Sequence, residues 1–208
     1  MGAALIVFGR WRRPAAALSG LVFLAFVLFL HIPHDVIIHA TRMGSWTAAF
    51  KEFAFFGGAL VVAGSLPRQA IDGGVKPSVL SKLEDFFMPL SKYPLAIMVA
   101  VFGLDHFIYT DLVRSLVPRW IPGDLFWTYF AGIALIASGV GIIINVKARL
   151  AATLLGVMLF IWVIILHIPR AIADPSGTLG NEWTSVCEAF AFSGIAFIMG
   201  RTIPEKRG

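Results

Sequence analysis

The sequence predicts an all-α membrane protein whose six transmembrane helices form one bundle. Hydrophobic residues make up 58% of the 208 residues and charged residues only 14%, whereas soluble domains carry roughly 25% charged residues. Six runs approach the roughly 20 apolar residues that a helix needs to cross a bilayer. Helices are expected because lipid cannot satisfy backbone N–H and C=O groups, and no run alternates like a barrel strand.

The six expected helices follow one another along the chain. They cover residues 14–33, 46–65, 93–110, 125–145, 149–169 and 183–200. Glycines recur inside them, among them Gly57, Gly132 and Gly156. Small residues allow neighbouring helices to approach closely in a membrane, so we expect tight helix contacts.

Basic residues in the connections predict the orientation of the chain. With six spans, both termini lie on the same side of the membrane. Most connecting Lys and Arg residues lie on that side, whereas the connections on the other side carry only Arg42, Arg114, Arg119 and Arg170. Cytoplasmic loops are enriched in Lys and Arg, so we expect both termini to face the cytoplasm.

The longest cytoplasmic connection contains an amphipathic segment at its end, 78–90. Its apolar residues recur at helical spacing beside three charged residues, Lys82, Glu84 and Asp85; the apolar set is Val79, Leu80, Leu83, Phe86 and Phe87. This pattern predicts a short helix lying on the inner membrane surface. The alternative is an ordinary amphipathic connector that has no partner.

An internal repeat relates the first two expected helices to the last two. Leu30-His31-Ile32-Pro33 matches Leu166-His167-Ile168-Pro169, and Trp46-Thr47 matches Trp183-Thr184. Self-similarity at a fixed offset indicates a duplicated unit, and the offset spans an even number of crossings, so the copies have the same orientation. The opening segment 1–9 then matches the end of the fourth helix, and we expect two further helices upstream of it.

Two acidic residues lie inside the expected helices. Glu52 and Glu188 follow the interfacial tryptophans of their helices by five or six residues, which places them about 8 Å inside at roughly 1.5 Å per residue. An intramembrane acid normally faces the bundle interior and finds a partner. His31 or Lys51 is the expected partner of Glu52, and His167 that of Glu188.

Polar residues from five helices predict a pocket that opens outward and binds a cofactor, a quinone or a small substrate. Its candidate residues all lie toward the outer helix ends: His31, Glu52, Asp105, His106, His167 and Glu188. The alternative is that these groups tie helix ends together, with the helices stopping at Pro33 and Pro169. Histidines at one depth could hold haem or a metal, but no HExxH or CxxCH spacing supports either.

The lipid bilayer is the expected partner of the apolar helices. Four tryptophans fall near its outer interface and are expected to anchor the helices there: Trp46, Trp120, Trp127 and Trp183. The net charge of +5 does not indicate nucleic-acid binding, since the basic residues are scattered between apolar runs and form no stripe.

From Tyr93 to Gly208 the chain resembles the DoxX-like membrane proteins, four-helix bundles of bacterial inner membranes. Three stretches carry the resemblance: Phe102-Gly103-Leu104-Asp105-His106-Phe107, the turn at 116–123, and Asn181-Glu182-Trp183-Thr184. The first two helices resemble the second pair of such a unit through the repeat. The chain is thus expected to consist of a helix pair (1–66), a cytoplasmic connector (67–92) and a DoxX-like unit (93–208).

The resemblance implies a cell inner membrane location and an accessory role in quinone-linked redox chemistry, beside a membrane redox partner protein. It carries over no catalytic residue, because most family members have no established activity. Two rivals remain open. The parallel repeat and buried acids favour a small-solute transporter, whereas the small-residue faces and the amphipathic connector favour a structural partner in a membrane complex.

Overall fold

The structure, a computed structural model, describes residues 11–39, 41, 43–67, 79–174 and 182–204. Some parts of the chain that carry predictions lie outside these residues: the segment 1–9, Arg42, Ser78 and Asn181. The chain forms two compact units, 1–98 and 99–208, and each is described by itself. The described residues are almost entirely helical and include no strand, which confirms the all-α fold class.

Five helices in the described part of the chain are long and apolar enough to cross a membrane. A sixth span is present if the bent pair Val79–Leu90 and Tyr93–Ile108 counts as one. The five are Arg12–His34, Ser45–Ser65, Asp124–Ile143, Ala148–Ala173 and Glu182–Thr202. The helices therefore lie where the apolar runs predict them, while their assembly into one six-helix bundle stays a prediction.

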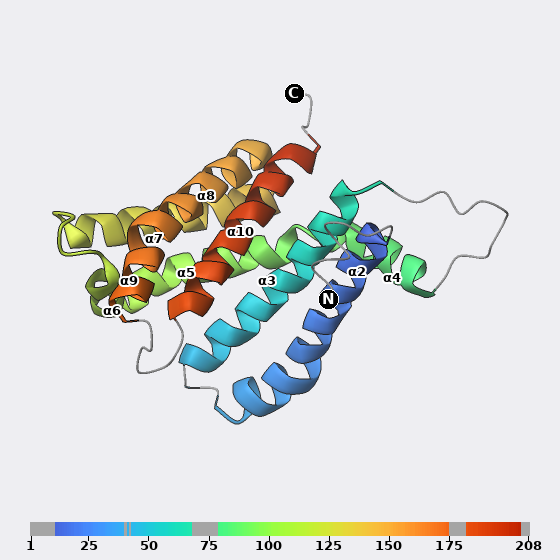
Figure 1. Ribbon diagram of the computed structural model, residues 1–208, viewed down its shortest axis with the longest axis horizontal. Helices are drawn as coiled ribbons and strands as arrows, with labels where there is room; N and C mark the ends of the chain where they lie inside the picture. The colour runs from blue at the N-terminus through green and yellow to red at the C-terminus, as the bar shows by residue number, and fades with distance from the viewer. Residues whose placement is uncertain (1–10, 40, 42, 68–78, 175–181, 205–208) are drawn as a thin grey trace. The chain divides into compact units, whose positions relative to one another are not determined.

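The first unit is built around two long helices that run side by side (Figure 1). Its elements are α2 (Arg12–Phe26), the π-helical η1 (Val27–Ile37), α3 (Met43–Ser65), α4 (Val79–Phe87), the 3-10 turn η2 (Met88–Leu90) and the first turns of α5 (Tyr93–Ile108). Gly20 allows the close approach of α2 and α3, because a Cβ atom there would lie 3.2 Å from the carbonyl oxygen of Phe56. Gly57 allows a similar approach of α3 to Pro94.

The second unit contains the rest of α5 and the helices α6 (Thr110–Leu116), α7 (Asp124–Ile143), α8 (Ala148–Trp162), η3 (Val163–His167, π-helical), α9 (Ile168–Ala173) and α10 (Glu182–Thr202). In Figure 1, α10 runs beside α8, and α7 also contacts α8. Glycine again marks the crossings. A Cβ atom on Gly156 would lie 3.0 Å from the ring of Phe197, and one on Gly103 2.7 Å from the carbonyl oxygen of Gly132.

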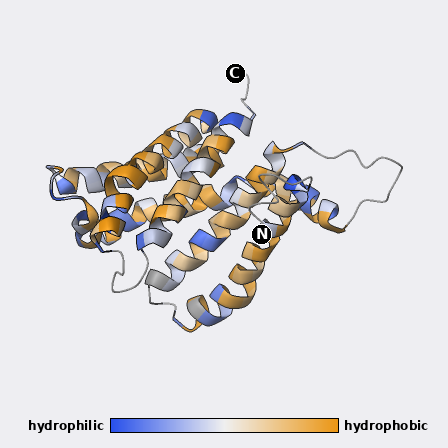
Figure 2. Cartoon of the chain, viewed as in Figure 1, coloured by the Kyte–Doolittle hydropathy of each residue, from blue (hydrophilic) through white to orange (hydrophobic). Residues whose placement is uncertain are grey.

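Apolar residues make up much of the helices of both units (Figure 2), and many of the large apolar side chains are exposed. Phe29 is 80% exposed and Phe126 62%. A soluble monomer rarely exposes wide apolar patches, because contact of such surface with water is unfavourable. The surface and the apolar helices together indicate a membrane protein. Trp46, Trp120, Trp127 and Trp183 are all exposed, as residues that contact the membrane interface would be.

The expectation that helices stop at Pro33 and Pro169 is wrong. Pro33 lies inside η1, and Pro169 lies in the first turn of α9, directly after η3. Proline lacks a backbone N–H and its ring clashes with the preceding turn of a regular α-helix. The wider π-helical turns at these positions accommodate the ring and allow the helix to continue.

The connector helix α4 is attached to α2 by a buried ion pair. The guanidinium of Arg13 pairs with the carboxylate of Glu84, and the two side chains are 15% and 6% exposed. The Nη1 atom of Arg13 also donates to the carbonyl oxygen of Leu66 at 3.1 Å. Glu84, which the sequence pattern groups with Lys82 and Asp85, is therefore turned into the protein, whereas those two residues are exposed.

The short turn between α7 and α8 ends α7 with a Schellman motif. Asn145 adopts φ 60°, and its N–H donates to the carbonyl of Ile142 while the N–H of Val146 donates to that of Gly141. These two bonds satisfy carbonyls that the helix end leaves open. Asparagine is one of the few residues that tolerates this left-handed conformation.

Candidate functional site

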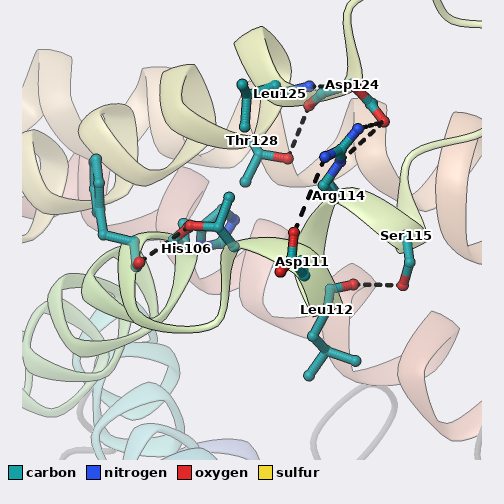
Figure 3. A network of polar contacts seen from close by, with 10 residues as sticks. His106, Asp111, Leu112, Arg114, Ser115, Asp124, Leu125 and Thr128 are labelled. Atoms are coloured by element: carbon teal, nitrogen blue, oxygen red, sulfur yellow. Dashed lines mark hydrogen bonds and ion pairs between the residues drawn. The ribbon is translucent and has the colours of Figure 1, made fainter.

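Two ion pairs join neighbouring helices in the second unit. Arg114 of α6 binds Asp124 at the start of α7, with its Nε and Nη2 atoms 3.2 and 3.1 Å from Oδ2. Figure 3 shows the Arg114 side chain directed at Asp124 with Asp111 beside it; the Asp111 carboxylate lies 4.0 Å away. The pair bridges the proline-containing turn at 117–123, so it fixes how α7 begins relative to α6.

The second pair joins α9 to α10. The Nε and Nη2 atoms of Arg170 lie 3.2 and 2.7 Å from the two carboxylate oxygens of Glu182. This two-point geometry is the strongest arrangement of an arginine and a carboxylate and fixes their relative orientation. The start of α10 is thereby held against the end of the α8–α9 helix.

His106 near the end of α5 is held in one orientation. Its Nδ1 atom lies 2.7 Å from the carbonyl oxygen of Phe102. A carbonyl can only accept, so Nδ1 carries the hydrogen, and Nε2 of the neutral ring is an acceptor. The ring stacks on the indole of Trp162 from α8, with centroids 6.3 Å apart and planes at 23°.

Gly132 of α7 explains why His106 lies at a tight helix crossing. A Cβ atom on Gly132 would come within 2.8 Å of the Cβ atom of His106, a separation that real side chains do not adopt. Thr128, one turn earlier and fully buried, donates from Oγ1 to the carbonyl of Asp124 at 2.8 Å. The backbone of α7 therefore packs directly against the turn of α5 that carries the histidine.

These contacts join α5 to α7 and α8, and the end of the α8–α9 helix to the start of α10. We call this part of the second unit the linked end. The neighbouring residues Asp105 and His106 lie there. His167, the last residue of η3, interacts electrostatically with Glu182. Two pairs of polar groups therefore lie at the linked end.

The other predicted site residues do not belong to these two pairs. Glu188 lies in α10, six residues after Glu182, and is half-buried. His31 in η1 and Glu52 in α3 are half-buried in the first unit, where the Oε2 atom of Glu52 is buried. A single pocket lined by all six predicted residues stays a prediction, as do the pairings of Glu52 and Glu188 with histidines. Within the described residues, no three His, Cys, Asp or Glu side chains gather as a metal site would require.

Sequence reasoning missed the groups that organise the linked end. Trp162 lies in the middle of an apolar run, where an aromatic residue usually contacts lipid or other helices. The pairing of Arg114 with Asp124 had a weak signal, since opposite charges flank a turn rich in proline and glycine. Arg170 and Glu182 also lie on either side of one connection, but nothing in the pattern predicts that they meet.

Comparison with known proteins gives one match. A family model described as "Domain of unknown function (DUF8561)" matches residues 95–188. The matched segment contains the predicted site residues of the second unit: Asp105, His106, His167 and Glu188. No curated protein matches the chain, and no solved structure matches it.

Proposed function

We propose that this chain is a multi-pass inner-membrane protein that binds a small aromatic redox molecule of the quinone class and acts as an accessory subunit in membrane redox chemistry. The observation that carries the proposal is the pairing of His106 with Trp162 at the linked end. An indole face suits a flat ring, and an imidazole of fixed tautomer offers a single hydrogen-bond acceptor beside it.

The fixed tautomer favours the reduced form of such a ligand. Because Nδ1 of His106 donates to the carbonyl of Phe102, the Nε2 atom of the neutral ring accepts a bond from a quinol hydroxyl. Oxidation of a quinol to a quinone releases two electrons and two protons. In the proposed role, His106 accepts one proton at Nε2, the neighbouring Asp105 carboxylate accepts the other, and the two electrons pass to a redox centre in a membrane partner protein.

The expected topology belongs to the same proposal. The excess of basic residues on one side supports termini in the cytoplasm. Three features support the internal repeat. The helices α2 and α8 are each 15 residues long, their π-helical continuations begin at the matching Val27 and Val163, and the matching Arg13 and Arg149 each donate to a carbonyl near the end of the partner helix. The DoxX-like resemblance of residues 93–208 completes the proposal.

Binding of a short-chain ubiquinol to the full chain in mild detergent tests the proposed site. The variant H106Q keeps a polar side chain but loses the acceptor at Nε2. Affinity should fall about tenfold, equivalent to about 1.4 kcal/mol, which is near the upper range for one neutral hydrogen bond. The matched control is H34Q, because His34 is an exposed histidine of the first unit.

Two further results complete the test. The variant W162A should also weaken binding, whereas W162F, which keeps a ring, should retain most of it. A protein that binds no ubiquinol, or binds it equally well with and without His106, would end the proposal. Quinone extracted from the purified protein and changes in its absorbance spectrum on reduction would support it.

A small-solute transporter is the second candidate. Parallel repeats occur in several transporter folds, where the substrate site lies at the repeat interface near the middle of the membrane. Uptake of a candidate solute into proteoliposomes that contain the chain, abolished by E52Q, would favour this reading over the redox role. Stable co-purification of a partner protein without a bound small molecule would favour a structural role.

A further inference from the structure

The helix α4 presents two different faces. Its inner face carries Leu80, Glu84 and Phe87, spaced by four and three residues as on one side of a helix. Its outer face continues into η2 and carries four exposed apolar side chains at the same kind of spacing. The exposed fractions are 75% for Val79, 37% for Leu83, 68% for Phe86 and 47% for Leu90.

The inner face is firmly attached to the first unit. Leu80 packs against the small core of Ala16, Ala17 and Ala63. The ring of Phe87 meets that of Phe56 edge-on, with centroids 5.3 Å apart. Between these apolar contacts lies the buried ion pair of Glu84 with Arg13, so both packing and charge fix which side of α4 faces the protein.

Two observations indicate that lipid covers the outer face. The segment Val79–Leu90 runs directly into α5, bent from it by 42°, and the two together are apolar enough to span a membrane. The exposed apolar face of α4 is therefore continuous with the apolar helix α5. Trp11 is 64% exposed beside the exposed Arg12, next to the arginine that holds α4; tryptophan and basic residues are enriched where helices meet the membrane surface.

We propose that α4 lies at the boundary between headgroups and acyl chains of the bilayer, with Val79, Leu83, Phe86 and Leu90 in the lipid, and that the Arg13–Glu84 ion pair sets this orientation. The exposed Lys82 and Asp85 then face the headgroups and water. Rotation of α4 about its axis would carry the Glu84 carboxylate toward lipid, where a charge is costly. The ion pair with Arg13 opposes that rotation. The inference does not depend on the ligand proposed for the linked end.

Spin labels attached to single cysteines measure the orientation directly. Cys187 is free and exposed, so a C187A background is needed before F86C or D85C is introduced. These neighbouring positions point to different sides of the helix. In vesicles of phosphatidylcholine and phosphatidylglycerol, a label at 86 should collide mainly with oxygen dissolved in lipid, and one at 85 mainly with a water-soluble nickel chelate. Equal exposure of both labels to the nickel chelate would overturn the placement in lipid.

Charge variants test the role of the ion pair. R13Q or E84Q should abolish the contrast between labels at 85 and 86, while the double exchange R13E/E84R should restore it. The matching arginine of the second unit provides the control, because Arg149 donates to the carbonyl of Gly200 and R149Q should leave the contrast unchanged. A contrast retained in both single variants would refute the orienting role, and if those variants fail to fold, the double exchange decides.

Discussion

Replacing Arg13 by methionine should destabilise the first unit strongly. Glu84 is 6% exposed and its partner 15%, so R13M leaves a buried carboxylate without its counter-charge. Breaking a buried pair from one side costs about 3–5 kcal/mol, and loss of the bond to Leu66 adds about 1 kcal/mol. At roughly 2–4 °C per kcal/mol for a chain of this size, this total of about 4–6 kcal/mol should lower the midpoint of unfolding by about 8–24 °C.

A double-mutant cycle separates this effect from lost packing. The double variant R13M/E84L replaces both charges by apolar groups of similar size, and such replacements are often neutral or stabilising. It should therefore unfold near the temperature of the unaltered protein, well above R13M. Thermal unfolding in one detergent, followed by circular dichroism and by protease cleavage near α4, provides the measurement. An R13M midpoint within about 1 °C of the unaltered protein would refute the reasoning, because a loss of about 0.5 kcal/mol or less is typical of an exposed pair.

Three further substitutions test packing in the second unit by the same unfolding assay. G132A should destabilise the protein by about 1–3 kcal/mol, since its Cβ atom would lie 2.8 Å from that of His106. The control G194A, with no atom within 4 Å of the new methyl group, should be neutral or slightly stabilising. Equal effects of the two variants would show that the helix crossing at Gly132 is looser than described. N145V should cost about 1 kcal/mol because valine resists φ 60°, while N145G should be tolerated; a harmless N145V would contradict the described turn. S193A removes a buried hydrogen bond of 2.9 Å to a carbonyl of α8 and should lower the free energy of unfolding by about 0.6 kcal/mol. S193T keeps a hydroxyl and should avoid part of this loss. A loss above about 2 kcal/mol would contradict this estimate and assign Ser193 a larger role.

The long helices could be predicted because membrane crossing depends on the length and apolarity of a run, which are properties of contiguous sequence. The amphipathic connector helix was equally predictable from its spacing. The burial of Glu84 could not be predicted, because the same helical pattern is compatible with Glu84 facing water or facing Arg13. That choice depends on where α2 lies, and position in space is not encoded in the local pattern.

The sequence indicates which polar residues stand out in the apolar helices but not how they are arranged in space. His106 and Asp105 stood out as polar residues in an apolar helix, and the structure places them at the linked end. The contribution of Trp162 could not be foreseen, because its meeting with His106 depends on how closely α5 packs against its neighbours. Gly103 and Gly132 set that distance, and the sequence indicated only that glycines favour close contacts.

The π-helical turn Val163–His167 is the place where the helix best absorbs a change in length. A wide turn of this kind holds one more residue than a regular helix would, so deleting a single residue there restores regular geometry and leaves the residues beyond it facing the same way. A deletion in the regular turns of α8 instead rotates everything beyond it by about 100°, the angle between successive residues of an α-helix. Arg170 then turns away from Glu182, and the start of α10 loses its attachment. Single deletions should therefore be tolerated better at Val163–His167 than in α8, although each leaves a continuous apolar helix.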